Sequence, residues 1–241
     1  MLKYIAFEIL GGVSLKKIFS YFTPWERTLW CSSVILIVLS FLIFDRSSYL
    51  TLIASVIGVS SLIFIAKGNP IGQGLMVIFC LFYGYISFSF TYYGEMLTYL
   101  GMSAPMATVA FLTWLKNPYK GNKSEVAVSS LKKGELPLLI LLTLAATVAS
   151  YFILKYFGTA NLLPSTFSVA TSFFAVCLCA KRSPFFALAY AINDLVLIFL
   201  WILAAIEDMS YFSVIICFVV FLVNDLYSFT NWLRMKKKQS A

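Results

Sequence analysis

The sequence has no histidine and few charged residues. Of its 241 residues, 12% are charged and 61% are hydrophobic, and the mean hydropathy is +0.91. Soluble domains have about 25% charged residues, so this chain has too little polar surface to dissolve as a compact globule. We therefore expect it to reside in lipid. The absence of histidine removes the most common general base and metal ligand, which disfavours an enzyme that depends on either.

The cysteines also provide no obvious chemistry. All five lie inside apolar runs, at Cys31, Cys80, Cys177, Cys179 and Cys217. Cys177 and Cys179 are two residues apart and would point in different directions from one helix, so they form no metal-binding pair. We expect the five thiols to be buried and inert, and we expect no metal site and no cofactor.

Long hydrophobic runs fill the chain instead. A transmembrane helix needs roughly 20 mostly apolar residues. Helix-start signals precede several runs: Thr23-Pro24-Trp25-Glu26 has the pattern of a capping box with proline at the first helical position, and Asn69-Pro70 and Ser183-Pro184 repeat the cap-then-proline pattern. Pro105 lies inside the fourth run and should kink it. The sequence predicts eight transmembrane helices, at about 25–44, 49–66, 70–91, 97–116, 136–157, 162–180, 184–205 and 211–233.

Residues 2–22 do not resemble a cleavable signal peptide. Glu8 interrupts the apolar stretch, and no small-residue cleavage site follows it. We expect this segment to lie on the membrane surface, with Lys3, Lys16 and Lys17 facing lipid headgroups.

Basic residues are distributed unevenly between the loops. If the N-terminus is cytoplasmic, sixteen of the 18 lysines and arginines lie on the cytoplasmic side, and only Arg46 and Lys155 lie outside. This asymmetry follows the positive-inside rule, and eight spans return the C-terminus to the cytoplasm. The net charge of +8 is thus a topology signal, and nucleic acid is not an expected partner.

Two stretches about 115 residues apart resemble each other. Each opens with Ala-Lys-x-x-Pro, at 66–70 and 180–184, and each closes with Phe-x-x-Trp-Leu followed by a basic residue, at 111–116 and 229–234. Between these motifs lie the pairs Glu95-Met96 and Asp208-Met209, and a Ser-Val pair precedes each copy. Chance similarity between hydrophobic spans is the alternative. The common order of Lys, Pro, acid and Trp favours a transporter built by duplication.

The repeats predict an all-α integral membrane protein. Residues 49–116 form the first three-helix repeat and 162–234 the second, and 117–161 hold a polar loop and a connector helix. Residues 1–48 add a surface segment and one extra N-terminal helix, and 235–241 are a basic tail. Because three spans plus one connector is an even number, both repeats enter the membrane in the same direction. A pseudo-twofold axis along the membrane normal should relate them.

Two acidic residues lie inside the spans, in Asn193-Asp194-Leu195 and Asn224-Asp225-Leu226. A rise of about 1.5 Å per residue places both near the middle of a ~30 Å hydrocarbon core. A charge there costs at least ~2.5–3.5 kcal/mol, which marks a candidate functional site. The alternative is structural, with each Asp held by neighbouring polar groups so that the helices pack together.

Aromatic and amide side chains share helix faces with these acids. Phe186, Tyr190, Asp194 and Trp201 lie on one face of the seventh span. On the eighth span, Asn224, Tyr227 or Ser228, and Asn231 form a polar stripe, with Phe221 one turn earlier. The third span adds weaker candidates. The predicted substrate-binding residues are Gln73, Phe79, Tyr83, Phe186, Tyr190, Asn193, Asp194, Asn224, Asp225 and Tyr227.

Two further aromatic residues, Trp114 and Trp232, lie near the cytoplasmic interface, where we expect them to anchor the helices in the membrane. No Lys or Arg falls in the middle of any predicted span. A phosphorylated substrate would therefore meet carboxylates and no cation. A neutral or cationic ring compound suits such a site better.

The second repeat resembles the PnuC family of vitamin transporters. The resemblance covers roughly 49–234 and is strongest in 184–234, with Asn193-Asp194 and the run from Phe221 to Trp232. It implies uptake of nicotinamide riboside for NAD biosynthesis by facilitated diffusion, with intracellular phosphorylation trapping the substrate. It also implies a 3+1+3 helix arrangement akin to a sugar-transporter fold, and homotrimers in the bacterial cytoplasmic membrane. The pyridinium cation of nicotinamide riboside agrees with the acidic site.

One departure from the family pattern keeps related substrates open. Many members have Trp seven and four positions before the seventh-span Asn, where this chain has Phe186 and Ala189. Thiamine, riboflavin or a deoxynucleoside is then an alternative, as is a proton-coupled mechanism that uses Asp194 or Asp225. A membrane-embedded enzyme or a sensory partner subunit is a further alternative. The missing nucleophile–base pattern disfavours the enzyme, and the duplicated halves with midplane acids disfavour the partner subunit.

Overall fold

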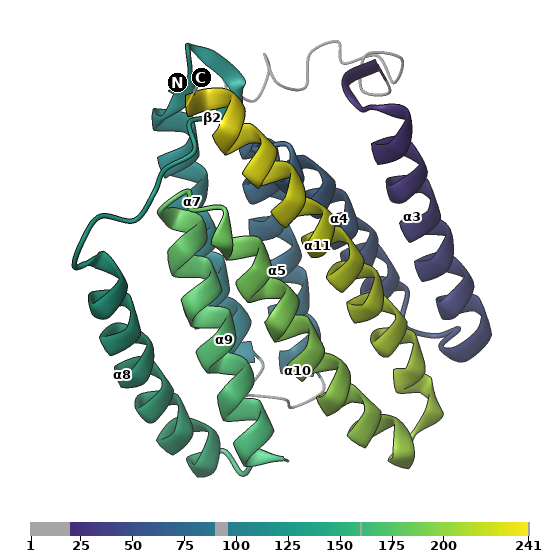
Figure 1. Ribbon diagram of the computed structural model, residues 1–241. Coiled ribbons are helices and arrows are strands. Elements are labelled where there is room, and N and C mark those ends of the chain that lie inside the picture. Colours follow the sequence, from purple (N-terminus) through teal and green to yellow (C-terminus); the bar gives the residue numbers. More distant parts are fainter. Residues whose placement is uncertain (1–19, 90–95, 160, 241) are drawn as a thin grey trace, which may run out of the picture.

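The structure is a computed structural model that describes residues 20–89, 96–159 and 161–240 (Figure 1). Long helices dominate it, and within the described ranges seven of them are long and apolar enough to cross a membrane. The eighth predicted span is also helical, because a π-helical segment leads directly into a 13-residue α-helix. The helices are α3 (Pro24–Phe44), α4 (Tyr49–Ala66), α5 (Pro70–Ser89), η1 (Leu97–Ser103), α7 (Ala104–Lys116), α8 (Glu135–Tyr156), α9 (Leu162–Ala180), α10 (Phe185–Glu207), η2 (Met209–Tyr211) and α11 (Phe212–Ser240). The all-helical prediction is confirmed, with helices at all eight predicted positions and seven of them candidate membrane spans.

Local signals explain the starts of α3 and α5. Thr23 and Glu26 form the predicted capping box of α3, with the Glu26 carboxylate accepting from Thr23 N at 2.7 Å. At α5 the Asn69 side chain accepts from Ile71 N at 3.0 Å. The Ser183 cap is wrong: α10 has Pro184 in the cap position and no side-chain cap bond.

The irregularity expected at Pro105 takes the form of the π-helix η1, which ends two residues before this proline. Proline has no N–H for the helical ladder, and π segments are a common way of absorbing such a defect. Residues 90–95, which include the predicted repeat residue Glu95, lie outside the described residues, as does most of the predicted surface segment 2–22.

The polar loop after α7 contains a small β-hairpin, which the all-α prediction did not include. Strand β1 (Pro118–Tyr119) pairs antiparallel with β2 (Asn122–Val126). The two residues between them, Lys120 and Gly121, have positive φ values of 48° and 81°. Two left-handed residues give a turn whose twist matches that of the flanking strands.

The helices of the two predicted repeats pack against each other across the molecule. Helix α7 of the first repeat contacts α9 of the second, and α11 of the second contacts α4 of the first. Helix α3 packs on α4 and α11, and α8 packs on α9. In Figure 1, α3 and α8 lie at opposite edges of the molecule. This arrangement is consistent with two parallel repeats and a connector helix, while the domain boundaries stay a prediction.

The distribution of polar groups is that of a protein in lipid. Small polar residues are buried between the helices, whereas large apolar side chains such as Leu141 and Phe152 of α8 are exposed. Exposing such side chains to water is unfavourable, whereas exposing them to the hydrocarbon of a membrane is not. The buried polar and charged residues include Ser33, Ser55, Ser61, Gln73, Asn193, Asp194, Asn224 and Asp225.

We call the two ends of the bundle the basic end and the opposite end. The basic end contains Lys67, Lys116, Lys181 and Arg234, at or near the ends of α4, α7, α9 and the membrane part of α11. It is at the top of Figure 1, where the C-terminus lies. The opposite end holds the α10–α11 connection with Glu207.

Candidate functional site

A cavity of about 540 Å³ lies between the helices of the two repeats. Its lining starts at the opposite end with Phe157, Asn161 and Glu207, which are exposed. Towards the basic end it reaches Ile65 and Phe186. The volume falls in the range of about 300–1,000 Å³ that is usual for small-molecule sites.

Seven of the ten predicted substrate-binding residues line this cavity. They come from the third, seventh and eighth predicted spans, which are α5, α10 and α11. The seven are Gln73, Phe79, Phe186, Tyr190, Asn193, Asp194 and Asp225. Tyr83, Asn224 and Tyr227 lie outside the lining. Their role in binding, like that of the seven, stays a prediction.

Asn193 is held by hydroxyl groups of α9. Its Oδ1 accepts from Thr171 Oγ1 at 2.8 Å and from Ser172 Oγ at 2.9 Å. The amide oxygen is therefore occupied, and the Nδ2 protons are the group that Asn193 can offer to a ligand. The sequence analysis missed this contribution from α9. The spacing of Ser165, Ser168 and Ser172 along one helical face is the signal that could have revealed it, since all three line the cavity.

Asp194 of α10 and Asp225 of α11 face each other in the cavity and their carboxyl groups interact directly. Both side chains are buried, at 4% and 3% exposure. Asp194 Oδ2 and Asp225 Oδ1 have no hydrogen-bond partner among the described residues. Because buried acceptors without partners are costly, these oxygens favour a ligand that brings N–H or O–H donors or a positive charge.

No basic side chain balances these acids. The described residues that line the cavity include neither lysine nor arginine, and they include a third acid, Glu207, at the mouth. Aromatic rings make up much of the remaining wall, and one of them, Tyr99 of η1, was not among the predicted residues. The aromatic lining residues are Phe79, Tyr99, Phe157, Phe186, Tyr190, Trp201, Tyr211, Phe218 and Phe221.

The polar stripe of the eighth span faces α3 and α4 rather than the cavity. Asn224 donates to Ser33 Oγ at 3.1 Å and to Val220 O at 2.8 Å. The Asn231 amide donates to Ala66 O at 2.8 Å. Consecutive residues of a helix are about 100° apart, so Asn224 cannot share the direction of Asp225.

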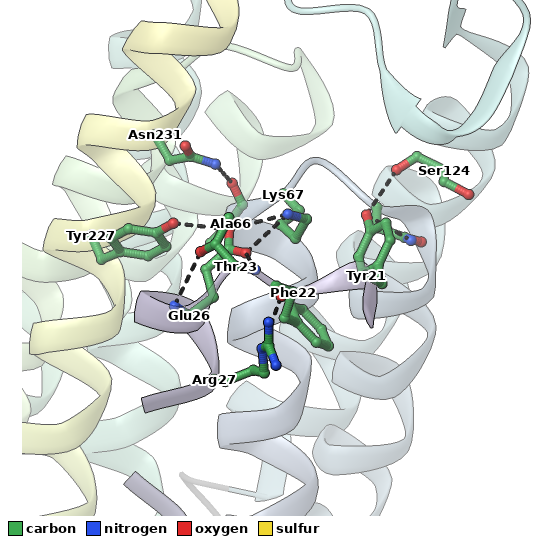
Figure 2. A network of polar contacts seen from close by, with 11 residues as sticks. Tyr21, Phe22, Thr23, Glu26, Arg27, Ala66, Lys67, Ser124, Tyr227 and Asn231 are labelled. Atoms are coloured by element: carbon green, nitrogen blue, oxygen red, sulfur yellow. Dashed lines mark hydrogen bonds and ion pairs between the residues drawn. The ribbon is translucent and has the colours of Figure 1, made fainter. Parts of the chain in front are cut away.

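Tyr227 belongs to a polar network at the basic end, centred on the buried Glu26 (Figure 2). Its hydroxyl donates to Glu26 Oε1 at 2.9 Å, and Lys67 forms an ion pair with Glu26 Oε2 at 3.0 Å. The network joins α3, the α4–α5 turn and α11, whose contacting residues are up to 201 positions apart in the chain. The network holds these three parts of the bundle together. Because the Tyr227 hydroxyl binds Glu26 within it, the side chain lies outside the cavity.

The expectation that Trp114 and Trp232 anchor the helices in the membrane interface is wrong. Both side chains are completely buried, at 0% exposure. Trp114 Nε1 donates to Cys179 O at 3.1 Å, and Trp232 Nε1 donates to Ile65 O at 2.9 Å. A buried indole N–H needs an acceptor, and the carbonyls of the last helical turn provide it. The prediction of buried cysteines is also wrong in one case, since Cys31 is exposed on α3.

Replacing Asn224 with alanine should reduce stability and leave ligand affinity within about twofold. The change removes two hydrogen bonds and strands the buried Ser33 hydroxyl, which corresponds to about 1–3 kcal/mol. Thermal unfolding in detergent and calorimetry measure the two effects separately. Asn193→Ala is the matched comparison, because Asn193 lines the cavity and its loss should weaken binding. A large loss of affinity in Asn224→Ala without a loss of stability would contradict the packing role.

Comparisons with known proteins agree with this architecture. Residues 48–234, more than half of the chain, match the family described as nicotinamide mononucleotide transporter. The nicotinamide riboside transporter PnuC of Neisseria mucosa is 25% identical over 230 residues, covering 94% of this chain and 87% of that protein. The protein of the same name from Haemophilus influenzae is 22% identical, covering 89% and 92%.

A solved structure has the same fold. The crystal structure of the vitamin B3 transporter PnuC superposes with a TM-score of 0.78 at 23% identity and covers 99% of both chains. With the family match, the membrane helices and the central cavity, this places the chain among multi-pass membrane transporters. The chain belongs to the nicotinamide mononucleotide transporter family, that is, the PnuC family.

Proposed function

We propose that this protein carries nicotinamide riboside across the bacterial cytoplasmic membrane by facilitated diffusion. The observation that carries the proposal is the pair of buried carboxyl groups, Asp194 and Asp225, with unpartnered oxygens in an aromatic cavity. The names of the PnuC relatives support the same substrate. Binding of the riboside to the purified protein, measured by calorimetry, is the direct test.

The chemistry of the ligand fits the groups that line the cavity. Its pyridinium ring is a flat cation, which aromatic faces and carboxylates both attract. The ribose hydroxyls and the carboxamide N–H groups can donate to Asp194 Oδ2 and Asp225 Oδ1. The Nδ2 protons of Asn193 can donate to a ligand oxygen. We assign Gln73, Phe79, Phe186 and Tyr190 to the walls around the ring.

The riboside should bind much more tightly than its 5′-phosphate, although the family description names the mononucleotide. A phosphate is normally held by Arg, Lys or helix N-termini, and the described lining offers neither Arg nor Lys. The phosphate would instead meet the carboxyl groups of Asp194, Asp225 and Glu207. Calorimetry with both compounds measures the difference, and equal affinities would contradict the proposed site.

We also propose that the basic end faces the cytoplasm and that the protein forms homotrimers. The sixteen-to-two distribution of basic residues supports the orientation. Single cysteines at Asp208 and Lys123, in a version without the native cysteines, should react with an impermeant reagent from outside and inside respectively. The trimer rests on the family resemblance, and mass measurement in detergent tests it.

Proton coupling is the second candidate, because the direct contact between Asp194 and Asp225 could hold a proton between the two carboxyl groups. A thiamine, riboflavin or deoxynucleoside substrate is favoured only by the exchange of family tryptophans for Phe186 and Ala189. Competition of these compounds against labelled riboside distinguishes the substrates. The coupling is tested by the gradients that drive uptake.

A further inference from the structure

The cavity stops short of the basic end. On α4 and α10 the lining residues nearest to that end are Ile65 and Phe186, each one residue from the end of its helix. Trp114 and Trp232 are not part of the lining and have 0% exposure. The Phe186 ring packs on both, at 4.9 Å from Trp232 and 6.3 Å from Trp114. A layer of three aromatic rings therefore separates the cavity from the basic end.

The two tryptophans make equivalent hydrogen bonds in opposite directions across the molecule. Trp114 closes the first repeat and donates to Cys179 O, at the end of α9 in the second. Trp232 closes the second repeat and donates to Ile65 O, at the end of α4 in the first. Ile65 and Cys179 each precede the Ala-Lys pair that opens the repeat motif. The two rings lie 5.1 Å apart. This crossed pair is consistent with a pseudo-twofold axis between the repeats.

The crossed hydrogen bonds can break without leaving their acceptor carbonyls unpaired, because each carbonyl has a second donor. Ile65 O also accepts from Gly68 N at 2.9 Å, and Cys179 O also accepts from Arg182 N at 2.9 Å. Each carbonyl therefore keeps a backbone partner when the indole leaves, so no orphaned acceptor remains in the turn. The released indole N–H groups would face water in an opened pathway. The indole N–H groups and the acceptor carbonyls therefore have hydrogen-bond partners in both the closed and the open conformation.

A segment after the hairpin holds the same two turns together. Val126 N donates to Gly68 O at 2.9 Å, in the turn that follows Ile65. Ser129 N donates to Arg182 O at 3.0 Å, in the turn that follows Cys179, and Arg182 Nη1 donates back to Ala127 O at 3.0 Å. Segment 126–129 thus links the two corners that carry the acceptor carbonyls.

We infer that Trp114 and Trp232 form the gate of the transport pathway at the basic end. In the conformation described, their crossed hydrogen bonds keep that end shut while the cavity is open at the opposite end. The gate opens when α7 and α11 move away from α9 and α4 and both bonds are lost. This inference rests on the proposed transport function, but it concerns residues that bind no substrate.

Accessibility of a cavity cysteine tests the gate. Met76 lines the cavity at intermediate exposure, and Met76→Cys in a version without native cysteines gives a single reporter. In this background an impermeant thiol reagent should react mainly from the opposite end. Trp114→Phe or Trp232→Phe removes only the N–H donor and should increase reaction from the basic end about 2- to 12-fold, the factor that corresponds to one net hydrogen bond of about 0.5–1.5 kcal/mol. The double variant should show a larger increase than either single one.

The matched control is Trp25→Phe, because Trp25 lies at the basic end of α3 and is 66% exposed. It should leave the labelling pattern unchanged, and cysteines at Lys123 and Asp208 report the sidedness of each preparation. The gate is refuted if the reporter with both tryptophans intact reacts mainly from the basic end. It is also refuted if well-folded Phe variants react as the intact chain does. The assay needs no substrate, so a wrong substrate assignment would leave its result intact, and a wrong gate would leave riboside uptake intact.

Discussion

Liposomes that contain the purified protein should accumulate nicotinamide riboside about 50-fold when an inside-negative potential of about 100 mV is the only driving force. The substrate carries one positive charge, and moving it across the membrane at that potential is worth ~2.3 kcal/mol, which corresponds to this ratio. The described lining offers the cation carboxyl groups and no basic residue that would repel it. Labelled riboside, with the potential set by potassium and valinomycin, measures the ratio.

A pH gradient without a potential should produce no accumulation, and liposomes without protein provide the blank. The proton-coupled alternative forecasts the reverse. In that case the pH gradient alone would drive uphill uptake, and Asp225→Asn would abolish it because the carrier of the proton is lost. That outcome would replace facilitated diffusion with coupled transport and assign the Asp194–Asp225 contact to proton carriage.

Replacing Asp225 or Asp194 with Asn should weaken riboside binding by about 10- to 150-fold, the range for a hydrogen bond to a charged group. Each substitution keeps the shape of the side chain and removes one of the two carboxyl groups that together attract the pyridinium ring. The matched control is Asp208→Asn, an exposed acid that lies outside the cavity and caps the short helix η2. Affinity should be unchanged there. If the two buried substitutions reduce stability and leave affinity within twofold, the acids serve packing and the proposed site is wrong.

The positions of the membrane helices could be predicted because length and hydrophobicity alone decide which segments can cross a bilayer. The face of α10 that lines the cavity could also be predicted, since Phe186, Tyr190, Asp194 and Trp201 repeat at helical spacing. These inferences use only properties of one segment at a time.

The orientation of α11 could not be predicted in this way. Helical spacing separates the polar stripe of Asn224, Tyr227 and Asn231 from Asp225, but the sequence does not tell which of the two faces borders the cavity. The reason lies in α3, outside the repeats, where Ser33 and Glu26 provide partners for the first two. The buried tryptophans have the same explanation. Their acceptor carbonyls are in the other repeat, and no local pattern marks a backbone carbonyl as an acceptor.

The two halves of the cavity are unequal, and this inequality bears on how the protein could have evolved. Counting from the repeated prolines and tryptophans, Asp194 and Asp225 correspond to Cys80 and Ala107 in the first repeat, and all four line the cavity. In a symmetric ancestor made of two identical halves, each acid would have had an equal in the other half, so positions 80 and 194 would have matched, as would 107 and 225. The present arrangement of one acidic and one neutral wall therefore requires that the two halves have separate coding sequences, as they do within this fused chain, so that each could acquire substitutions that the other did not share.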